Sequence, residues 1–158
     1  MRWVRPASIH LTIKFLGEVP DDRLAALSAA VDEVAAGSGS FELTVKGTGC
    51  FPPRGAARVL WAGLEEPTGR LADCHQSCEQ VMERLGFEPE RRRFSPHLTL
   101  GRVRQGAGVG GLREAVAKLA DFDGGRQAVG ELILFESQLR REGAVYTALH
   151  RAKLAEGG

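Results

Sequence analysis

One short sequence pattern occurs twice in this chain, as His-Leu-Thr-Ile at residues 10–13 and as His-Leu-Thr-Leu at residues 97–100. Polar and aliphatic residues alternate in both copies, and a period of two is typical of a half-buried β-strand. Such a strand carries its histidine and threonine on one face, roughly 7 Å apart, and its aliphatic residues on the other, where a core anchors them. Two strands of this kind facing one cleft would present two imidazoles and two hydroxyls to a single small group.

The length and composition indicate one globular domain that spans residues 1–158. A chain of this size buries roughly two-thirds of the surface that its unfolded form exposes, so disulfides or structural metals are not obligatory. The longest apolar stretch, Val59–Leu64, is too short to cross a bilayer. The net charge of +1 provides no overall field that would attract a polyanion. We therefore expect no membrane association, and the partner has to be inferred from local sites.

Periodicity along the rest of the chain predicts an α+β domain. Strands are expected at residues 9–15, 41–46, 58–64 and 97–103, with a closing hairpin at residues 127–140 and 144–154. Helices are expected from the turn at residues 20–22 to Gly37, from Pro67 to Leu85, and from Leu112 to Ala120. Residues 47–55 are rich in glycine and proline and are expected to form a loop with Phe51 near its tip. Helices and strands do not alternate strictly enough for a doubly wound parallel sheet.

The two polar faces suit chemistry at a phosphodiester. In-line displacement at phosphorus needs a base on the entering oxygen and an acid on the departing oxygen, on opposite sides. Imidazole has an unperturbed pKa near 6.5, so one such group can be neutral while another is protonated near neutral pH. Threonine hydroxyls can donate hydrogen bonds to the non-bridging phosphate oxygens. This arrangement requires neither a metal nor a cofactor.

A zinc site is the competing interpretation of a second cluster, Cys74, His75 and Cys78, together with Cys50. Cys74 and Cys78 fall on the apolar stripe of the helix expected after Pro67, where free cysteine behaves as a small hydrophobic residue. Core packing is therefore favoured over metal binding. Three cysteines form an odd set, which indicates a reducing cytoplasm rather than a disulfide framework.

Further segments accompany the two His-x-Thr copies in order along the chain. They are residues 2–6 (RWVRP), 10–19 (HLTIKFLGEV), 49–52 (GCFP), 59–63 (VLWAG), 94–102 (FSPHLTLGR) and 139–146. With these segments the chain resembles the 2H phosphoesterases, and among them the RNA 2′,3′-cyclic phosphodiesterases, also called 2′-5′ RNA ligases. The resemblance implies a two-lobed α+β fold in which pseudo-twofold antiparallel sheets surround a central cleft, with the helices outside.

The resemblance also implies a role for each repeated polar residue. In similar proteins the second histidine activates water and the first protonates the departing 3′ oxygen, which leaves a 2′-phosphate. Carried onto this sequence, His97 is the general base and His10 is the general acid. Thr12 and Thr99 are the ligands of the phosphate oxygens. In reverse, the same groups would join a cyclic phosphate to a 5′ hydroxyl as a 2′-5′ bond.

Two further residues are candidates for substrate binding, each with a structural alternative. Arg102 follows Thr99 by three residues, so a regular strand would turn it to the opposite face unless Gly101 introduces a bulge. Its alternatives are phosphate contact, which the resemblance implies, and a surface salt bridge. Phe51 could stack on a terminal base or could pack in the core.

The expected substrates are RNA ends or nucleotides that bear a 2′,3′-cyclic phosphate, and the expected protein is a cytoplasmic monomer. Two alternatives stay open: a non-catalytic module that binds nucleotides or RNA ends, and the same chemistry on a small cyclic nucleotide. Similar proteins carry a strand and a helix before the RWVRP segment, where this chain has only Met1. We therefore expect a chain that is truncated at its N-terminus relative to the family.

Overall fold

The computed structural model describes residues 1–107 and 110–156 and has an α+β fold. The chain divides into two compact units, each built from three separate segments. Unit 1 comprises Met1–Thr12, Leu43–Glu65 and Pro96–Gln127, and unit 2 comprises Ile13–Glu42, Glu66–Ser95 and the chain from Ala128 onward. Both His-x-Thr copies lie in unit 1. The candidate site can therefore be built from the residues of one unit.

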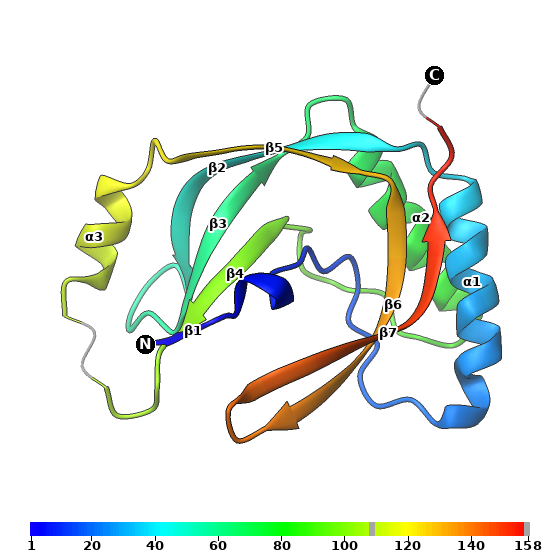
Figure 1. The fold of residues 1–158 in the computed structure, drawn as a ribbon, viewed down its shortest axis with the longest axis horizontal. Coiled ribbons are helices and arrows are strands. Elements are labelled where there is room, and N and C mark those ends of the chain that lie inside the picture. The colour runs from blue at the N-terminus through cyan, green and yellow to red at the C-terminus, as the bar shows by residue number, and fades with distance from the viewer. Residues whose placement is uncertain (108–109, 157–158) are drawn as a thin grey trace. The chain divides into compact units, whose positions relative to one another are not determined.

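A five-stranded sheet provides the framework of the site. Its strand order is β1-β4-β3-β2-β5, and β2, β3 and β4 run side by side in Figure 1. The strands are β1 (Arg2–Trp3), β2 (Phe41–Phe51), β3 (Val59–Glu65), β4 (His97–Arg102) and β5 (Asp123–Val129). The pairs β1–β4, β4–β3 and β3–β2 are antiparallel. This order places β4, which carries the second His-x-Thr copy, between β1 and β3.

Helix α3 (Leu112–Lys118) contacts one end of the β2–β3 pair. The hydroxyl of Thr48 on β2 donates to the carbonyl of Val116 at 3.0 Å. Thr48 pairs with Ala62, and Ala62 and Leu60 are the buried residues of β3. Because paired residues share a face of the sheet, Thr48, Leu60 and Ala62 define the core face. The alternate residues of the same strands lie on the opposite face.

The strand expected at residues 9–15 is not formed, which corrects that prediction. After a short 3-10 turn at Pro6–Ser8, the chain makes a single bridge to β4, from Leu11 to Leu98. A strand needs hydrogen bonds to a neighbour along its length, and this segment meets β4 at one residue. The alternation also predicts a buried Phe15, which is instead 80% exposed, whereas Leu11 is partly buried.

Strand β2 is longer than predicted, because the glycines expected in a loop belong to the strand. The register of β2 against β3 shifts between Val45 and Thr48, where Gly47 adopts a left-handed φ of 72° and donates its N–H to the carbonyl of Phe122. At Gly49 a Cβ atom would lie 2.1 Å from the indole of Trp61. Glycine is therefore required at this position so that the indole can lie over the strand.

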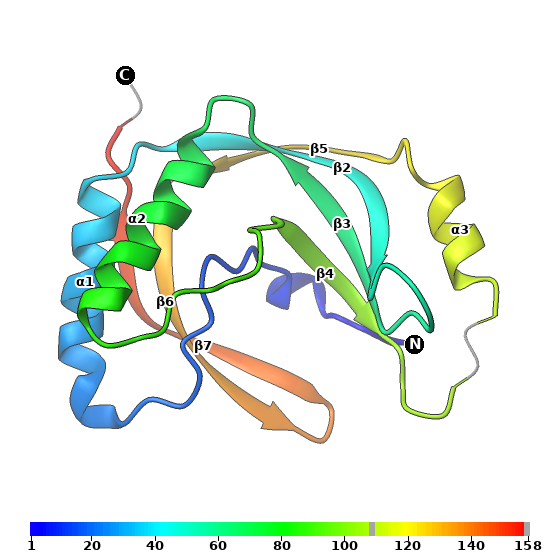
Figure 2. The same cartoon turned by 180° about the vertical axis from the view of Figure 1, so that it is seen from behind.

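Unit 2 combines two helices with a hairpin. Helices α1 (Leu24–Ala36) and α2 (Arg70–Arg84) lie side by side in Figure 2, and α1 contacts both strands of the β6 (Glu131–Arg140) and β7 (Gly143–Lys153) hairpin. A 3-10 turn, Asp21–Arg23, precedes α1. The hairpin is confirmed, whereas the single strand expected from residue 127 to 140 breaks at Gly130 into β5 and β6.

A buried ion pair ties three segments of unit 2 together. Lys14 contacts Glu79 on α2 with an N···O distance of 2.9 Å, and their side chains are 6% and 15% exposed. The Lys14 ammonium also donates to the carbonyl of Glu88, and the N–H of Glu90 donates to the Glu79 carboxylate. Both charges of the pair therefore have further hydrogen-bonding partners, which buried charges require.

Candidate functional site

The bridge between Leu11 and Leu98 aligns the two His-x-Thr copies antiparallel to each other. In that register His10 lies opposite Thr99 and Thr12 lies opposite His97. Alternation in β4 puts His97 and Thr99 on the face away from Leu98, and the same alternation about Leu11 predicts that face for His10 and Thr12. The two histidines are diagonal neighbours, with Cβ atoms about 7–8 Å apart by the usual geometry of such pairs. The bridge thus brings the two His-x-Thr copies next to each other in unit 1.

The ring of His10 is oriented by the turn that precedes it. Ile9 has an extended backbone, and the Nδ1 atom of His10 lies 2.8 Å from the carbonyl oxygen of Ser8. A carbonyl oxygen only accepts hydrogen bonds, so Nδ1 is the donor and carries a proton. Nε2 is therefore the nitrogen that can exchange a proton with a bound group.

The ring of His97 is held by aromatic side chains from β2 and β3. Phe51 contacts it edge-on, with ring centroids 5.0 Å apart, and Trp61 lies at 6.2 Å. Phe51 and Trp61 contact each other at 5.3 Å. Phe51 ends strand β2 instead of projecting from a loop tip, which corrects its expected position. Phe51 is half-buried and packs on Trp61 and His97, so its proposed stacking on a base stays a prediction.

A β-bulge turns Arg102 toward the face that carries the histidines. Along β3, the alternate residues Val59, Trp61 and Gly63 share one face and pair with Arg102, Thr99 and His97, respectively. The spacing from Thr99 to Arg102 is one residue longer than on β3, so Leu100 is the extra residue of the bulge. Arg102 consequently lies on the same face as His97 and Thr99, which we call the histidine face. A regular strand would have placed it on the core face.

Arg113, on α3, braces the segment that follows Phe51. Its guanidinium donates to the carbonyl oxygens of Pro52 at 2.8 Å, Pro53 at 3.1 Å and Gly55 at 2.6 Å. It also lies 3.3 Å from the sulfur of Cys50. A planar guanidinium has several donors in a fixed arrangement, so it can bind several carbonyls at once. The segment after Phe51 is thereby attached to α3.

Replacing Arg113 with alanine is expected to lower the free energy of unfolding by roughly 1–2 kcal/mol, because several charge-assisted hydrogen bonds at a partly exposed site are lost. Urea denaturation measures this change. Arg113→Lys is the matched control, since it keeps the charge but cannot present donors to all of these carbonyls. A lysine variant as stable as the wild type would contradict the brace and indicate that charge alone matters.

The cysteines do not form a metal centre in the part of the chain that the structure describes. Cys74 and Cys78 are buried in unit 2, as their place on the apolar stripe predicts. Burial raises the pKa of the Cys78 thiol to about 11, which opposes the thiolate form that binds zinc. His75 stacks on Phe94 with ring centroids 4.0 Å apart. Among the described residues no group of three or more histidine, cysteine or acidic side chains could hold a metal ion.

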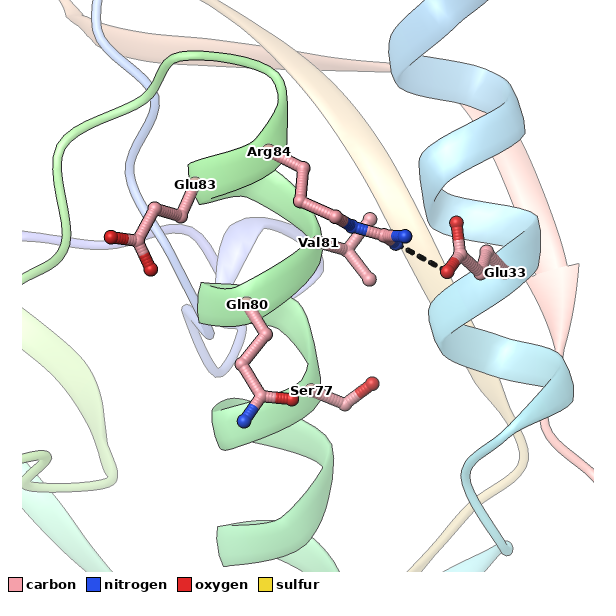
Figure 3. Close-up of a pocket in the computed structure, with 6 residues that line it drawn as sticks. All are labelled: Glu33, Ser77, Gln80, Val81, Glu83 and Arg84. Atoms are coloured by element: carbon pink, nitrogen blue, oxygen red, sulfur yellow. Dashed lines mark hydrogen bonds and ion pairs between the residues drawn. The ribbon is translucent and has the colours of Figure 1, made fainter.

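A shallow hollow between α1 and α2 lies in unit 2 and shares no residue with the histidine face. Figure 3 shows its lining, with the guanidinium of Arg84 on α2 paired to the carboxylate of Glu33 on α1. The other lining residues are Ser77, Gln80, Val81 and Glu83. None of the lining residues is a histidine, so the paired His-x-Thr copies of unit 1 have no counterpart in this hollow. Over residues 1–107 and 110–156, no helix is both long and apolar enough to span a membrane.

Sequence reasoning missed two residues that shape the site. Trp61 packs on both Gly49 and Phe51, and its only sequence signal was its place in the VLWAG segment of the resemblance. Arg113 had no signal, because its partners lie about sixty positions away in the chain. Both contacts depend on which segments the fold brings together.

Comparison with known proteins gives a consistent set of relatives. Residues 1–61 and 63–146 match the family described as LigT-like phosphoesterase. An RNA 2′,3′-cyclic phosphodiesterase of Methanothermobacter thermautotrophicus is 32% identical over 154 residues, covering 98% of this chain and 83% of that protein. A protein of the same description from Thermotoga maritima is 32% identical over 156 residues, covering 99% and 80%, respectively.

Solved structures agree with these relatives. The structure of a Thermus thermophilus protein matches with a TM-score of 0.82 at 27% identity, covering 99% of this chain and 84% of that one. The structure of Escherichia coli LigT complexed with 3′-AMP matches with a TM-score of 0.75 at 28% identity, covering 98% and 82%. The chain therefore has the α+β fold of the 2H phosphoesterases, as the resemblance implies.

Proposed function

The chain belongs to the LigT-like phosphoesterase family, and from this premise we propose that it hydrolyses the 2′,3′-cyclic phosphate ends of RNA to 2′-phosphomonoesters. The observation that carries this proposal is the Leu11–Leu98 bridge, which sets the two His-x-Thr copies against each other in unit 1. Relatives that cover most of this chain bear the name RNA 2′,3′-cyclic phosphodiesterase, which supports the choice of substrate.

The proposed reaction transfers one proton to His97 and one proton from His10, and it needs no metal. His97 accepts a proton from water as the water oxygen attacks phosphorus. The bond from phosphorus to the 3′ oxygen breaks, and Nε2 of His10 donates a proton to that departing oxygen. The hydroxyls of Thr12 and Thr99 donate hydrogen bonds to the non-bridging oxygens, where charge accumulates in the transition state.

The Nδ1 contact of His10 supports its role as the acid. Because the Ser8 carbonyl holds the Nδ1 proton, the ring presents Nε2 for donation in one orientation. The edge of Phe51 against His97 limits rotation of the second ring in a similar way. Fixed rings favour catalysis, since the groups need no reorganisation at the moment of reaction.

The proposal extends to the reverse reaction and to the setting of the enzyme. The same groups, with their proton roles exchanged, would join a cyclic phosphate to a 5′ hydroxyl as a 2′-5′ bond. Hydrolysis should dominate because water is the more abundant nucleophile. We further propose that the protein acts as a cytoplasmic monomer with residues 1–158 as one functional domain, and that Phe51 can also stack a terminal base.

Turnover of adenosine 2′,3′-cyclic phosphate in the presence of EDTA tests the proposal. We expect adenosine 2′-phosphate as the product, followed by ³¹P NMR, with a rate that excess chelator does not change. Loss of activity in EDTA would contradict the two-histidine mechanism. Binding of the cyclic nucleotide without turnover would favour the non-catalytic module, and a 3′-phosphate product would reverse the expected choice of leaving oxygen.

A further inference from the structure

Two arginines face each other across neighbouring strands at the edge of the sheet in unit 1. Arg2 on β1 pairs in register with Arg102 on β4, and both side chains are exposed. Directly opposed residues of an antiparallel pair have Cβ atoms about 4.5–5.5 Å apart, so the two guanidinium groups can reach the same anion. Each guanidinium offers a planar fork of donors to phosphate oxygens.

The arginine pair lies on the same face as the two histidines. Arg102 is on the histidine face because of the bulge at Leu100, and its partner Arg2 shares that face. On β3, Val59 pairs with Arg102 and Trp61 pairs with Thr99, and these two β3 residues are two positions apart. Arg102 and its partner Arg2 therefore lie about 7 Å along the strand direction from Thr99. A bound group at the arginines would be a near neighbour of the reacting phosphate.

We propose that Arg2 and Arg102 form a phosphate subsite that binds the phosphodiester on the 5′ side of the terminal, cyclic-phosphate-bearing nucleotide of an RNA. This inference rests on the proposed function and identifies its substrate class as an oligonucleotide end. One ribose separates successive phosphates of a single strand. This spacing is of the same order as the distance along the strand between Arg102 and Thr99. A nucleoside 2′,3′-cyclic phosphate has no second phosphate and cannot use the subsite.

The test compares a dinucleotide ending in a 2′,3′-cyclic phosphate with the corresponding nucleoside cyclic phosphate. For Arg2→Gln we expect the ratio of the two kcat/KM values, dinucleotide over mononucleotide, to fall about tenfold through KM, because one charge-assisted contact is lost. Arg2→Lys should recover only part of the ratio, since an ammonium lacks the planar fork. Arg151→Gln, which removes an exposed ion pair with Glu131 in unit 2, is the control and should leave the ratio unchanged.

A second measurement uses the wild-type protein alone and so does not depend on how the variants fold. A dinucleotide whose internal linkage is a neutral methylphosphonate keeps both nucleosides but loses the charge. We expect the kcat/KM of this neutral dinucleotide to be no higher than that of the mononucleotide. We also expect the excess kcat/KM of the normal dinucleotide over the mononucleotide to decrease as the salt concentration rises. Equal turnover of the charged and neutral dinucleotides would overturn the subsite.

Failure of the subsite and failure of the proposed function are distinguishable. If the wild type does not hydrolyse any cyclic phosphate, the proposed function is wrong. Binding of a dinucleotide 3′-phosphate, measured by calorimetry for the wild type and for Arg2→Gln, then still tests the subsite. If cyclic phosphates are hydrolysed but Arg2→Gln lowers both kcat/KM values equally, the function stands and the subsite is refuted.

Discussion

Replacing either His10 or His97 with asparagine is expected to lower turnover of a 2′,3′-cyclic phosphate by roughly 10²–10⁴-fold, the range that one general acid or base contributes. Asparagine is chosen because its amide can still donate a hydrogen bond, to the Ser8 carbonyl in the case of residue 10, but it cannot transfer a proton at neutral pH. Initial rates under saturating substrate measure the loss. Circular dichroism and urea unfolding of each variant serve as the folding control.

The two histidines should differ when the leaving group no longer needs a proton. In a 3′-deoxynucleoside 2′-(4-nitrophenyl phosphate), nitrophenolate departs in place of the 3′ oxygen and is stable as an anion. We expect His10→Asn to retain most of the wild-type rate on this substrate, whereas His97→Asn keeps its full loss. The opposite pattern would exchange the two roles. Equal losses on this substrate would remove the assignment of acid and base altogether.

Replacing Lys14 with methionine is expected to lower the free energy of unfolding by about 3–5 kcal/mol, the usual cost of removing one partner of a buried ion pair. The carboxylate of Glu79, 15% exposed, would lose the ammonium 2.9 Å away and keep only the Glu90 N–H and the His75 ring, 3.7 Å away, as partners. The carbonyl of Glu88 would lose a donor as well. Urea denaturation of the wild type and the variant measures the difference.

The double variant Lys14→Met with Glu79→Leu is the matched control. Replacing both charges with apolar side chains removes the uncompensated carboxylate, so most of the lost stability should return. Recovery should be incomplete, because the N–H of Glu90 loses its acceptor on Glu79. A double variant as unstable as Lys14→Met would show that the packing of the lysine side chain, and not its charge pair, sustains this part of unit 2.

Much of the site was predictable because its residues repeat in a strict period. The aliphatic residues between His10 and Thr12, and between His97 and Thr99, predict which side chains share a face whether or not a full strand forms. The period cannot predict how many residues of a segment find a hydrogen-bonding neighbour. Residues 9–15 therefore carry a strand pattern but make one bridge.

The position of Arg102 shows why local patterns are insufficient. A bulge changes the face of every residue that follows it, and whether one forms depends on the partner strand. Here the register of β3 against β4 produces a bulge at Leu100, which puts Arg102 on the histidine face. Gly49 is a second example. Its local sequence predicts a loop, and only the indole of Trp61 on the neighbouring strand explains why glycine is needed at this position of β2.

The sequence by itself determined which chemical groups are available for the proposed reaction: two imidazoles and two hydroxyls, one of each in a His-x-Thr pattern whose alternation predicts a shared face. It also determined the α+β class and the principal helices and hairpin. Only the tertiary structure decided that the two copies meet at Leu11 and Leu98, that Arg102 joins them, and that Arg2 lies opposite Arg102. These outcomes depend on pairing between segments distant in the chain, and the energy of such pairing is a property of the assembled sheet rather than of any one segment.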